Sequence, residues 1–216
     1  MTVDGADRTA VYDGWSRHPR LLDAFYAFVF FGRERAIRRH AVSVLDLATG
    51  ERVLELGCGP GNGLAALRER VGPDGRVVAV DTSAGMVRRA RNRVRTAGWE
   101  NVHVLRGDAT RLPVCEESFD AVYAAMSLSA MPDPLGAVDA AHDALRSGGR
   151  LAVLDAQPFQ HLPLTLLNFA LVPLFRALTN WVPEVDLPEG ITNRFDETDV
   201  TTYTDGTLFV AHARRT

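Results

Sequence analysis

Three glycines at alternate positions, Gly57, Gly59 and Gly61, follow an apolar run in the stretch VLELGCGPGNG, residues 53–63. Because glycine has no Cβ, it lets the backbone approach a bound molecule closely and adopts turn conformations that other residues resist. A helix that starts just after such a loop presents free backbone N–H groups to a ligand. The spacing therefore predicts a ligand-binding loop, and a glycine-rich turn without any ligand stays open as the alternative.

Two phosphate-binding patterns are excluded at this loop. The dinucleotide fingerprint would require glycine at position 62 or 64, where the chain has Asn62 and Leu64. The Walker loop requires a lysine, whereas all 24 basic residues are arginine. The absence of lysine also excludes Schiff-base chemistry and the lysine-dependent kinase site.

Acidic residues at the ends of the predicted strands indicate which ligand the loop binds. Asp81 ends the second strand, where its carboxylate can accept both hydroxyls of a ribose. Asp108 and Ala109 follow the third strand and suit the edge of an adenine. Glu55 ends the first strand and is expected to place negative charge before the loop. A ligand with a ribose, an adenine and an ammonium group, but no phosphate, fits this set, and S-adenosyl-L-methionine is such a ligand.

Alternating strands and helices are predicted to position these residues. Continuous apolar runs, typical of strands covered on both faces, predict strands in RVLELG (52–57), RVVAVD (76–81), NVHVLRGD (101–108), FDAVYAAM (119–126) and GGRLAVLD (148–155). The closing stretch VTTYTDGTLFVAHARR predicts an antiparallel hairpin that turns at Asp205-Gly206. The fold class is therefore α/β, with a doubly wound, mostly parallel seven-stranded sheet that ends in an antiparallel hairpin.

Helices are predicted between the strands from their periodicity and end signals. They span Gly63 to Val71, Leu135 to Arg146, and the stretch after Ser83, which is the expected N-cap, to about Ala97, where Gly98 closes the helix. A further helical region is expected from Leu21 to about Leu47. No clear helix is predicted between Pro183 and the terminal hairpin.

In the order and spacing of its motifs the chain resembles class I S-adenosylmethionine-dependent methyltransferases over roughly residues 50–156. The similar pieces are VLELGCGPG, VVAVDTSAGMV, VLRGDATRLP, ESFDAVYAAMSLSAMPDP and LRSGGRLAVLD. The resemblance implies a Rossmann-like methyltransferase fold and S-adenosyl-L-methionine as the cofactor.

The resemblance also implies a role for each matching residue. Gly57, Gly59 and Gly61 would pass under the methionine part of the cofactor, and Asp81 would hold the ribose. The remaining implied contacts are Thr82 and Met86 near the ribose and adenine, Asp108 with Ala109 at the adenine, and Ala125 with Met126 lining the methyl-donor pocket.

Within this superfamily the chain looks most like the ubiquinone/menaquinone C-methyltransferase and phospholipid N-methyltransferase type, on the strength of VYDGWS, LPVCEESFDAV and TDGTLFVAHARR. The whole chain, 1–216, is then expected to form a single methyltransferase domain with four parts: an N-terminal helical lid (1–49), a cofactor-binding core (50–156), an apolar substrate cap (157–199) and a terminal hairpin (200–216). The stretch SLSAMPDP lacks the polar substrate-facing residues usual in that type, which leaves the substrate less defined than the cofactor.

Charge and composition limit the kinds of molecule that the protein is expected to bind and where it is expected to be located. A net charge of −3 argues against general nucleic-acid binding, and Cys58 and Cys115 lack metal-ligand spacing, so no metal site is expected. The polar, acidic N-terminus predicts no signal peptide, and the longest apolar stretch, PLTLLNFALVPLF, is shorter than the roughly 20 residues of a membrane span. We therefore expect a cytoplasmic protein, with peripheral membrane contact and the oligomeric state left open.

The acceptor is expected to be a small apolar or lipid-like molecule, such as a quinone precursor or a phospholipid head group. The segment from Phe159 to Val182 is apolar all around a helical projection and is interrupted by prolines, so it is read either as a buried structural helix or as a lid. As a lid it would join the aromatic helix near Phe25 to Phe31, and Leu167 or Phe175 would face the acceptor.

No catalytic base is assigned, although Tyr12, His18 and His161 could bring a polar group near the acceptor. Two alternatives to a methyltransferase stay open at this point. One is a noncatalytic binding protein of the same fold, and the other is an NAD-dependent oxidoreductase.

Overall fold

The computed structural model describes residues 5–30, 32–112 and 114–216, so residues 1–4, Phe31 and Pro113 lie outside the described residues. A seven-stranded sheet in the order β3-β2-β1-β4-β5-β7-β6 forms the centre of the molecule. Five neighbouring strands are parallel, and β7 pairs antiparallel with both β5 and β6. The predicted fold class is confirmed.

The strand positions follow from the apolar runs in the sequence. The strands are β1 (Arg52–Leu56), β2 (Arg76–Asp81), β3 (Val102–Arg106), β4 (Phe119–Ala125), β5 (Leu145–Ala156), β6 (Glu197–Tyr203) and β7 (Leu208–Arg214). The runs in β1, β4 and β5 lack alternation because both of their faces are buried. The polar β6 closes the edge of the sheet, where exposed and buried residues need not alternate.

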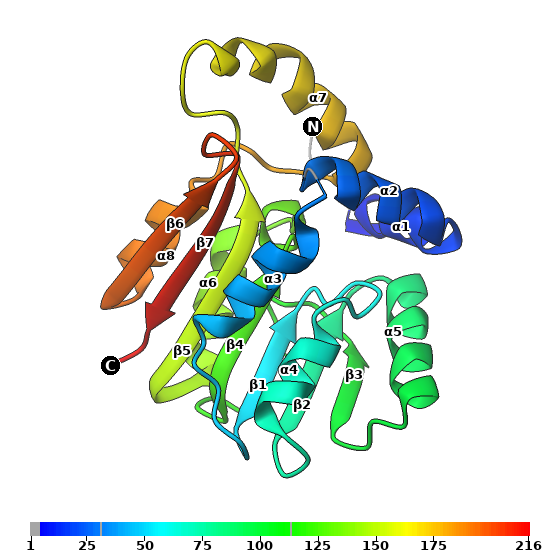
Figure 1. Ribbon diagram of the computed structural model, residues 1–216, viewed down its shortest axis with the longest axis vertical. Coiled ribbons are helices and arrows are strands. Elements are labelled where there is room, and N and C mark those ends of the chain that lie inside the picture. The colour runs from blue at the N-terminus through cyan, green and yellow to red at the C-terminus, as the bar shows by residue number, and fades with distance from the viewer. Residues whose placement is uncertain (1–4, 31, 113) are drawn as a thin grey trace.

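Helices cover both faces of the sheet (Figure 1). On one face lie α3 (Glu34–Ser43), α4 (Leu64–Val71) and α5 (Ala84–Ala97), and on the other lie α6 (Pro134–Ala144) and α8 (Leu187–Arg194). The two apolar cores are the layers between these helices and the sheet. Side chains such as Leu67 and Ile191 are fully buried there, which is the main stabilising contribution of the layered arrangement.

The ends of α5 are set by the residues that the sequence indicates. The Ser83 side chain accepts a hydrogen bond from the backbone N–H of Met86 at 3.2 Å. Gly98 ends the helix in the left-handed conformation, with φ of 64°. Both expectations are confirmed, and together they fix the start of α5 next to the end of β2.

Three expectations about helices are wrong. The helix α8 occupies the stretch after Pro183 in which none is predicted. Its start signal is the sequence Asp186-Leu-Pro-Glu189, where the Asp186 carboxylate accepts from the backbone N–H of Glu189 at 3.0 Å. The single region expected from Leu21 is divided into α2 (Pro19–Val29) and α3, because the chain turns around Gly32, at φ of 74°.

The third correction concerns Pro173, which does not break the apolar segment. After the short 3-10 helix η2 (Leu164–Leu167), the helix α7 (Asn168–Thr179) continues through this proline. Pro173 and the preceding turn at Phe169 lie on the exposed side of α7, so water can hydrogen-bond the carbonyl that the missing N–H leaves free.

The helices α1 (Gly5–Arg17), α2 and α7 lie together at the end of the molecule toward which the parallel strands run (Figure 1). Side chains of α1 connect them: the Tyr12 hydroxyl donates to the carbonyl of Thr179 at 2.6 Å, and Trp15 Nε1 donates to the carbonyl of Leu178 at 2.8 Å. Segments far apart in the sequence thus form one cover over the carboxyl ends of the strands, where open α/β sheets bind ligands. We call these three helices and η2 the lid.

Candidate active site

A cavity of about 200 Å³ lies between the glycine-rich loop, the ends of β2, β3 and β4, and the lid; we call it the loop cavity. Eight of the predicted site residues line it: Gly57, Gly59, Asp81, Thr82, Met86, Asp108, Ala109 and Met126. Seven of these residues lie at or just after the ends of four different strands, and Met86 lies in the first turn of α5. The parallel sheet brings them together because all four strands end at the same edge.

Two of the other predicted residues, Gly61 and Ala125, lie beside the loop cavity without lining it. A Cβ at Gly61 would collide with the Leu64 side chain, and the Gly61 carbonyl accepts from Arg93 Nη1 at 2.8 Å. Gly61 therefore serves the turn into α4 and its packing. Ala125 packs against the apolar core at the end of β4.

Asp81 lines the loop cavity and hydrogen-bonds the loop that follows β1 and the loop that follows β2. Its Oδ2 accepts from the backbone N–H of Gly59 and its Oδ1 from that of Ser83, each at 2.8 Å. Burial raises the pKa of Asp81, and the two backbone N–H groups oppose that shift. Each carboxylate oxygen can accept a further hydrogen bond, so the side chain can still receive two donors from a ligand.

The glycine-rich loop is held in a conformation that favours glycine. Gly57 has φ of 62° and Gly59 has φ of 54°, both in the left-handed region. A Cβ at Gly57 would collide with the Ser127 side chain, whereas one at Gly59 would meet nothing within 4 Å. Gly59 thus leaves open space on the side of the loop cavity that it lines.

Glu55, the eleventh predicted residue, lies beneath the loop and not in the loop cavity. Its side chain is only 3% exposed, and no described residue hydrogen-bonds its Oε2. Burial raises the pKa of Glu55 to about 8, although the nearby Arg38 guanidinium lowers it. The expectation that Glu55 places negative charge before the loop stays a prediction, and burial opposes it by raising the pKa of the carboxyl group.

We expect Glu55→Gln to change how stability depends on pH. Glutamate ionises near pH 4.5 in the unfolded chain and near pH 8 in the folded one, so the folded state binds more protons between these values. Stability that Glu55 contributes therefore falls as the pH rises through this window. Urea unfolding should show the variant to be more stable than the parent by roughly 2–4 kcal/mol at about pH 8.5, with the difference shrinking toward about pH 4.

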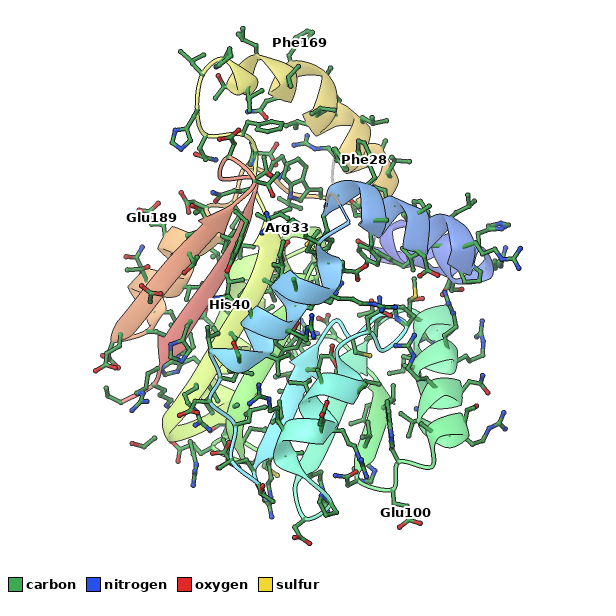
Figure 2. The ribbon with its side chains drawn as sticks, in the orientation of Figure 1. Phe28, Arg33, His40, Glu100, Phe169 and Glu189 are labelled. Atoms are coloured by element: carbon green, nitrogen blue, oxygen red, sulfur yellow. The ribbon has the colours of Figure 1, made fainter. Side chains whose placement is uncertain are left out.

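The exposed Glu100→Gln provides the control for this experiment (Figure 2), because it removes the same charge from the surface. It should leave the stability difference near zero across the same pH range. If the stability of both variants relative to the parent depends on pH in the same way, the pKa of Glu55 is not raised in the folded protein.

The N-terminal motif VYDGWS belongs to α1, which lies over the loop cavity. Asp13 Oδ1 accepts from the Ser83 hydroxyl at 2.6 Å and from the backbone N–H of Gly85 at 2.9 Å, which keeps the pKa of Asp13 below its usual value. This contact fixes α1 on the first turn of α5. The adjacent Tyr12 then lines the loop cavity.

A second cavity, of about 160 Å³, lies between the lid and the sheet; we call it the apolar cavity. Aromatic rings make up much of its wall, with Phe175 packed between Phe25 and Trp181 at centroid distances of 5.8 and 6.2 Å. Residues on the inner side of α7 complete that wall: Asn168, Leu171, Val172, Phe175 and Thr179. Their spacing is that of one helix face.

Only some of the residues that the sequence suggests for contact with the acceptor line the apolar cavity. Tyr12 and Phe175 line the apolar cavity, whereas His18, His161 and Leu167 do not. His18 and His161 are exposed, and the Leu167 side chain is 47% exposed.

Several residues that line the loop cavity are not among those predicted from the sequence: Tyr26, Pro60, Val80, Ser127, Ala130, Met131, Pro132 and Asn180. Tyr26 and Asn180 belong to the lid or its end, so only the tertiary fold places them there. The group from 127 to 132 directly follows β4, and its position after a parallel strand is the one signal that could have indicated it.

The structure is that of an α/β protein with strand order 3-2-1-4-5-7-6, and it has a cavity at the ends of β1, β2 and β3 that adjoins an apolar cavity. Comparisons with known proteins identify the family. Residues 53–149 match the family model described as a methyltransferase domain.

Two curated relatives and one solved structure are similar to the chain. Aklanonic acid methyltransferase DauC of Streptomyces sp. (strain C5) is 35% identical over 162 residues, which are 73% of this chain and 72% of that protein. Demethylmenaquinone methyltransferase of Staphylococcus epidermidis is 30% identical over 159 residues, covering 73% of this chain and 65% of that protein, just under two thirds. A SAM-dependent methyltransferase from Aquifex aeolicus has the same fold, with a TM-score of 0.63 at 20% identity over 83% of this chain and 89% of that one.

The chain therefore belongs to the class I S-adenosylmethionine-dependent methyltransferases. It is an enzyme that uses S-adenosyl-L-methionine as its methyl donor, which replaces the NAD-dependent alternative. In the described part of the chain, none of the helices combines the length and hydrophobicity needed to cross a bilayer.

Proposed function

We propose that the enzyme methylates a small apolar acceptor of the quinone-like class, which binds in the apolar cavity. The observation that carries this proposal is the junction of the two cavities. Tyr12, Tyr26, Met126 and Ala130 line both, so a molecule in the apolar cavity meets the loop cavity directly. The wall of the apolar cavity is largely aromatic and aliphatic, which favours a ring system over a sugar or a nucleic acid.

The relatives support the same acceptor class. One is named for methylation of aklanonic acid and the other for methylation of demethylmenaquinone. Methyl transfer from a sulfonium requires proximity, alignment and exclusion of water more than a dedicated catalytic group. The lid supplies these conditions by covering the junction, and it combines two helices of the proposed N-terminal lid (1–49) with η2 and α7 of the proposed substrate cap (157–199).

The loop cavity has the groups that the methyl donor requires. Asp81 would hold the ribose hydroxyls, with Thr82 and Met86 beside them, and Asp108 with Ala109 would face the adenine. Gly57 and Gly59 would lie under the methionine part, and Met126 would line the site of the methyl group. When bound, S-adenosyl-L-methionine supplies an electrophilic methyl group there.

A pair of glycine variants tests this assignment. Gly59 and Gly98 have φ of 54° and 64°, and a Cβ at either would meet nothing within 4 Å. Alanine should therefore strain both positions alike, by about 1 kcal/mol. Because only Gly59 lines the loop cavity, we expect only Gly59→Ala to weaken S-adenosylhomocysteine binding, by about tenfold, in calorimetry. Equal affinity in both variants would remove Gly59 from the cofactor site.

An acceptor screen tests the function itself. Release of S-adenosylhomocysteine would be measured with aklanonic acid, reduced demethylmenaquinone and phosphatidylethanolamine as acceptors. The proposal expects turnover with a quinone-like compound and none with the phospholipid. Tight cofactor binding without turnover of either quinone-like compound would contradict the acceptor assignment.

We also propose that the outer face of the lid contacts a lipid bilayer. The most exposed large apolar side chains of the described chain are Phe169 at 92%, Leu162 at 78% and Leu166 at 72%, all on η2, α7 or the turn before them. Figure 2 shows Phe169 at the tip of the molecule, with Phe28 on the neighbouring helix. The segment from Phe159 to Val182 has one charged residue, an arginine, and no acidic one, so nothing in it repels an anionic membrane surface.

A bilayer is the favoured partner of the outer face of the lid because this face adjoins the apolar cavity. Phe28 lines that cavity and is 65% exposed, so it lies at the rim. A lipid-soluble acceptor could thus pass from the bilayer to the cavity without crossing water.

We expect Phe169→Asp to lower binding to vesicles of phosphatidylglycerol and phosphatidylethanolamine by about tenfold in sedimentation, since one aromatic side chain no longer enters the lipid. Leu135→Asp is the matched control, because Leu135 is 43% exposed on α6, outside the lid. If the two variants sediment alike, the outer face of the lid does not contact lipid.

A further inference from the structure

The junction of the two cavities decides how an acceptor must be oriented. A methyl group held in the loop cavity can reach only an atom that lies close to the four shared residues, Tyr12, Tyr26, Met126 and Ala130. Met126 and Ala130 have apolar side chains, so among the described residues the two tyrosines are the polar side chains that both cavities share.

The hydroxyl proton of Tyr12 is already used. It is donated to the carbonyl of Thr179 at 2.6 Å, a contact that connects α1 to α7. Ser129, a polar neighbour in the apolar cavity, likewise donates its hydroxyl to the buried Asp155, at 2.5 Å. Neither hydroxyl is available as a donor to an acceptor without breaking a contact inside the protein.

Tyr26 differs, because its ring is fixed but its hydroxyl is not. The ring packs against Phe25 and Phe30 at centroid distances of 6.0 and 6.4 Å, and the Arg38 guanidinium lies 5.4 Å from its centroid. Arg38 is held in turn by Glu34, with Nε 2.8 Å from Oε1. Within the described part of the chain, no hydrogen bond engages the Tyr26 hydroxyl.

The surroundings keep the Tyr26 phenol in its neutral form. Burial raises its pKa above the ordinary value, the Arg38 guanidinium opposes this, and Glu34, Asp81 and Asp155 raise it further. At neutral pH the hydroxyl is thus a hydrogen-bond donor and not a base.

We propose that Tyr26 orients the acceptor by donating its hydroxyl hydrogen bond to an acceptor oxygen next to the atom that is methylated. This inference rests on the proposed function and narrows it. The acceptor is a fused or substituted ring with a carbonyl, carboxylate or phenolate oxygen, and not an ammonium head group. An ammonium group could not accept this hydrogen bond, and Arg38 beside the ring disfavours a second cation.

A matched pair of probes tests the proposal by binding alone. The probes are 2,3-dimethyl-1,4-naphthoquinone, which has carbonyl oxygens and no free position for thiol addition, and 2,3-dimethylnaphthalene, which has the same shape without oxygen. Affinities would be measured with S-adenosylhomocysteine present for the parent, Tyr26→Phe and Tyr203→Phe. Tyr203 lies at the end of β6 and lines neither cavity, so its variant is the control.

The expected result is a loss of about tenfold in quinone affinity for Tyr26→Phe, with unchanged affinity for the hydrocarbon and for S-adenosylhomocysteine. The control should bind all three molecules as the parent does. Retention of the quinone preference in Tyr26→Phe, or an equal loss for both probes, would overturn the role of Tyr26. If the parent binds neither probe, the apolar cavity is not the acceptor site, and the proposed acceptor class fails together with this inference.

The acceptor screen distinguishes a failure of the inference about Tyr26 from a failure of the proposed function. If the parent turns over a quinone-like compound while Tyr26→Phe keeps the same kcat/KM and the same quinone affinity, the proposed function stands and the inference about Tyr26 is rejected. A lower kcat/KM for the acceptor at an unchanged KM for S-adenosylmethionine supports both.

Discussion

Replacement of Asp81 by alanine is expected to lower the affinity for S-adenosylmethionine by about 5- to 150-fold, which corresponds to roughly 1–3 kcal/mol. The carboxylate lines the loop cavity and is the group proposed to accept the ribose hydroxyls. Without it, both hydroxyls would face an apolar gap and lose their partners. The loop would also change, because Asp81 accepts the backbone N–H groups of Gly59 and Ser83.

Asp81→Asn separates these two contributions. The amide keeps one oxygen that can accept a backbone N–H, but it loses the second acceptor and the charge, so its affinity should lie between those of the parent and the alanine variant. Calorimetry with S-adenosylhomocysteine measures the affinities, and thermal unfolding measures the loosening of the loop. Parent-like affinity in the alanine variant would mean that another residue holds the ribose.

The sequence could predict the loop cavity because its residues follow strands. Gly57, Gly59, Asp81 and Asp108 each lie within a few residues of a strand end, and neighbouring parallel strands end at one edge of the sheet. Local signals therefore imply the three-dimensional arrangement. The same reasoning located α5 correctly from Ser83 and Gly98, since capping depends on residues adjacent in the chain.

The residues that were missed or misread depend on contacts between distant segments. Tyr26 reaches both cavities only because α2 packs beside α7 and over the sheet, and no pattern around position 26 encodes that packing. The charge of Glu55 depends on its burial beneath the loop, which a strand-end position does not reveal. In α8 the start signal at Asp186 was present, but the helix is short and contains Gly190, which weakens its periodicity.

Replacement of Phe175 by aspartate is expected to reduce acceptor binding by at least about 100-fold, because an ionised carboxylate would enter an apolar cavity without a partner. The ring lies against Phe25 and Trp181 and forms part of the wall of that cavity. Cofactor affinity should stay within about threefold of the parent value, since Phe175 does not line the loop cavity. S-adenosylhomocysteine release at varied acceptor concentration, with calorimetry of the cofactor, measures both quantities.

Leu167→Asp is the matched control for this variant. From the sequence alone either residue is expected to face the acceptor, but Leu167 is 47% exposed and lies outside the wall of the apolar cavity. A carboxylate at this position stays in water, so use of a water-dispersed acceptor should equal that of the parent, while binding to vesicles should weaken. If Phe175→Asp instead loses cofactor binding and unfolds early, α7 is part of the structural core, and the proposal of a lid over an apolar acceptor site fails.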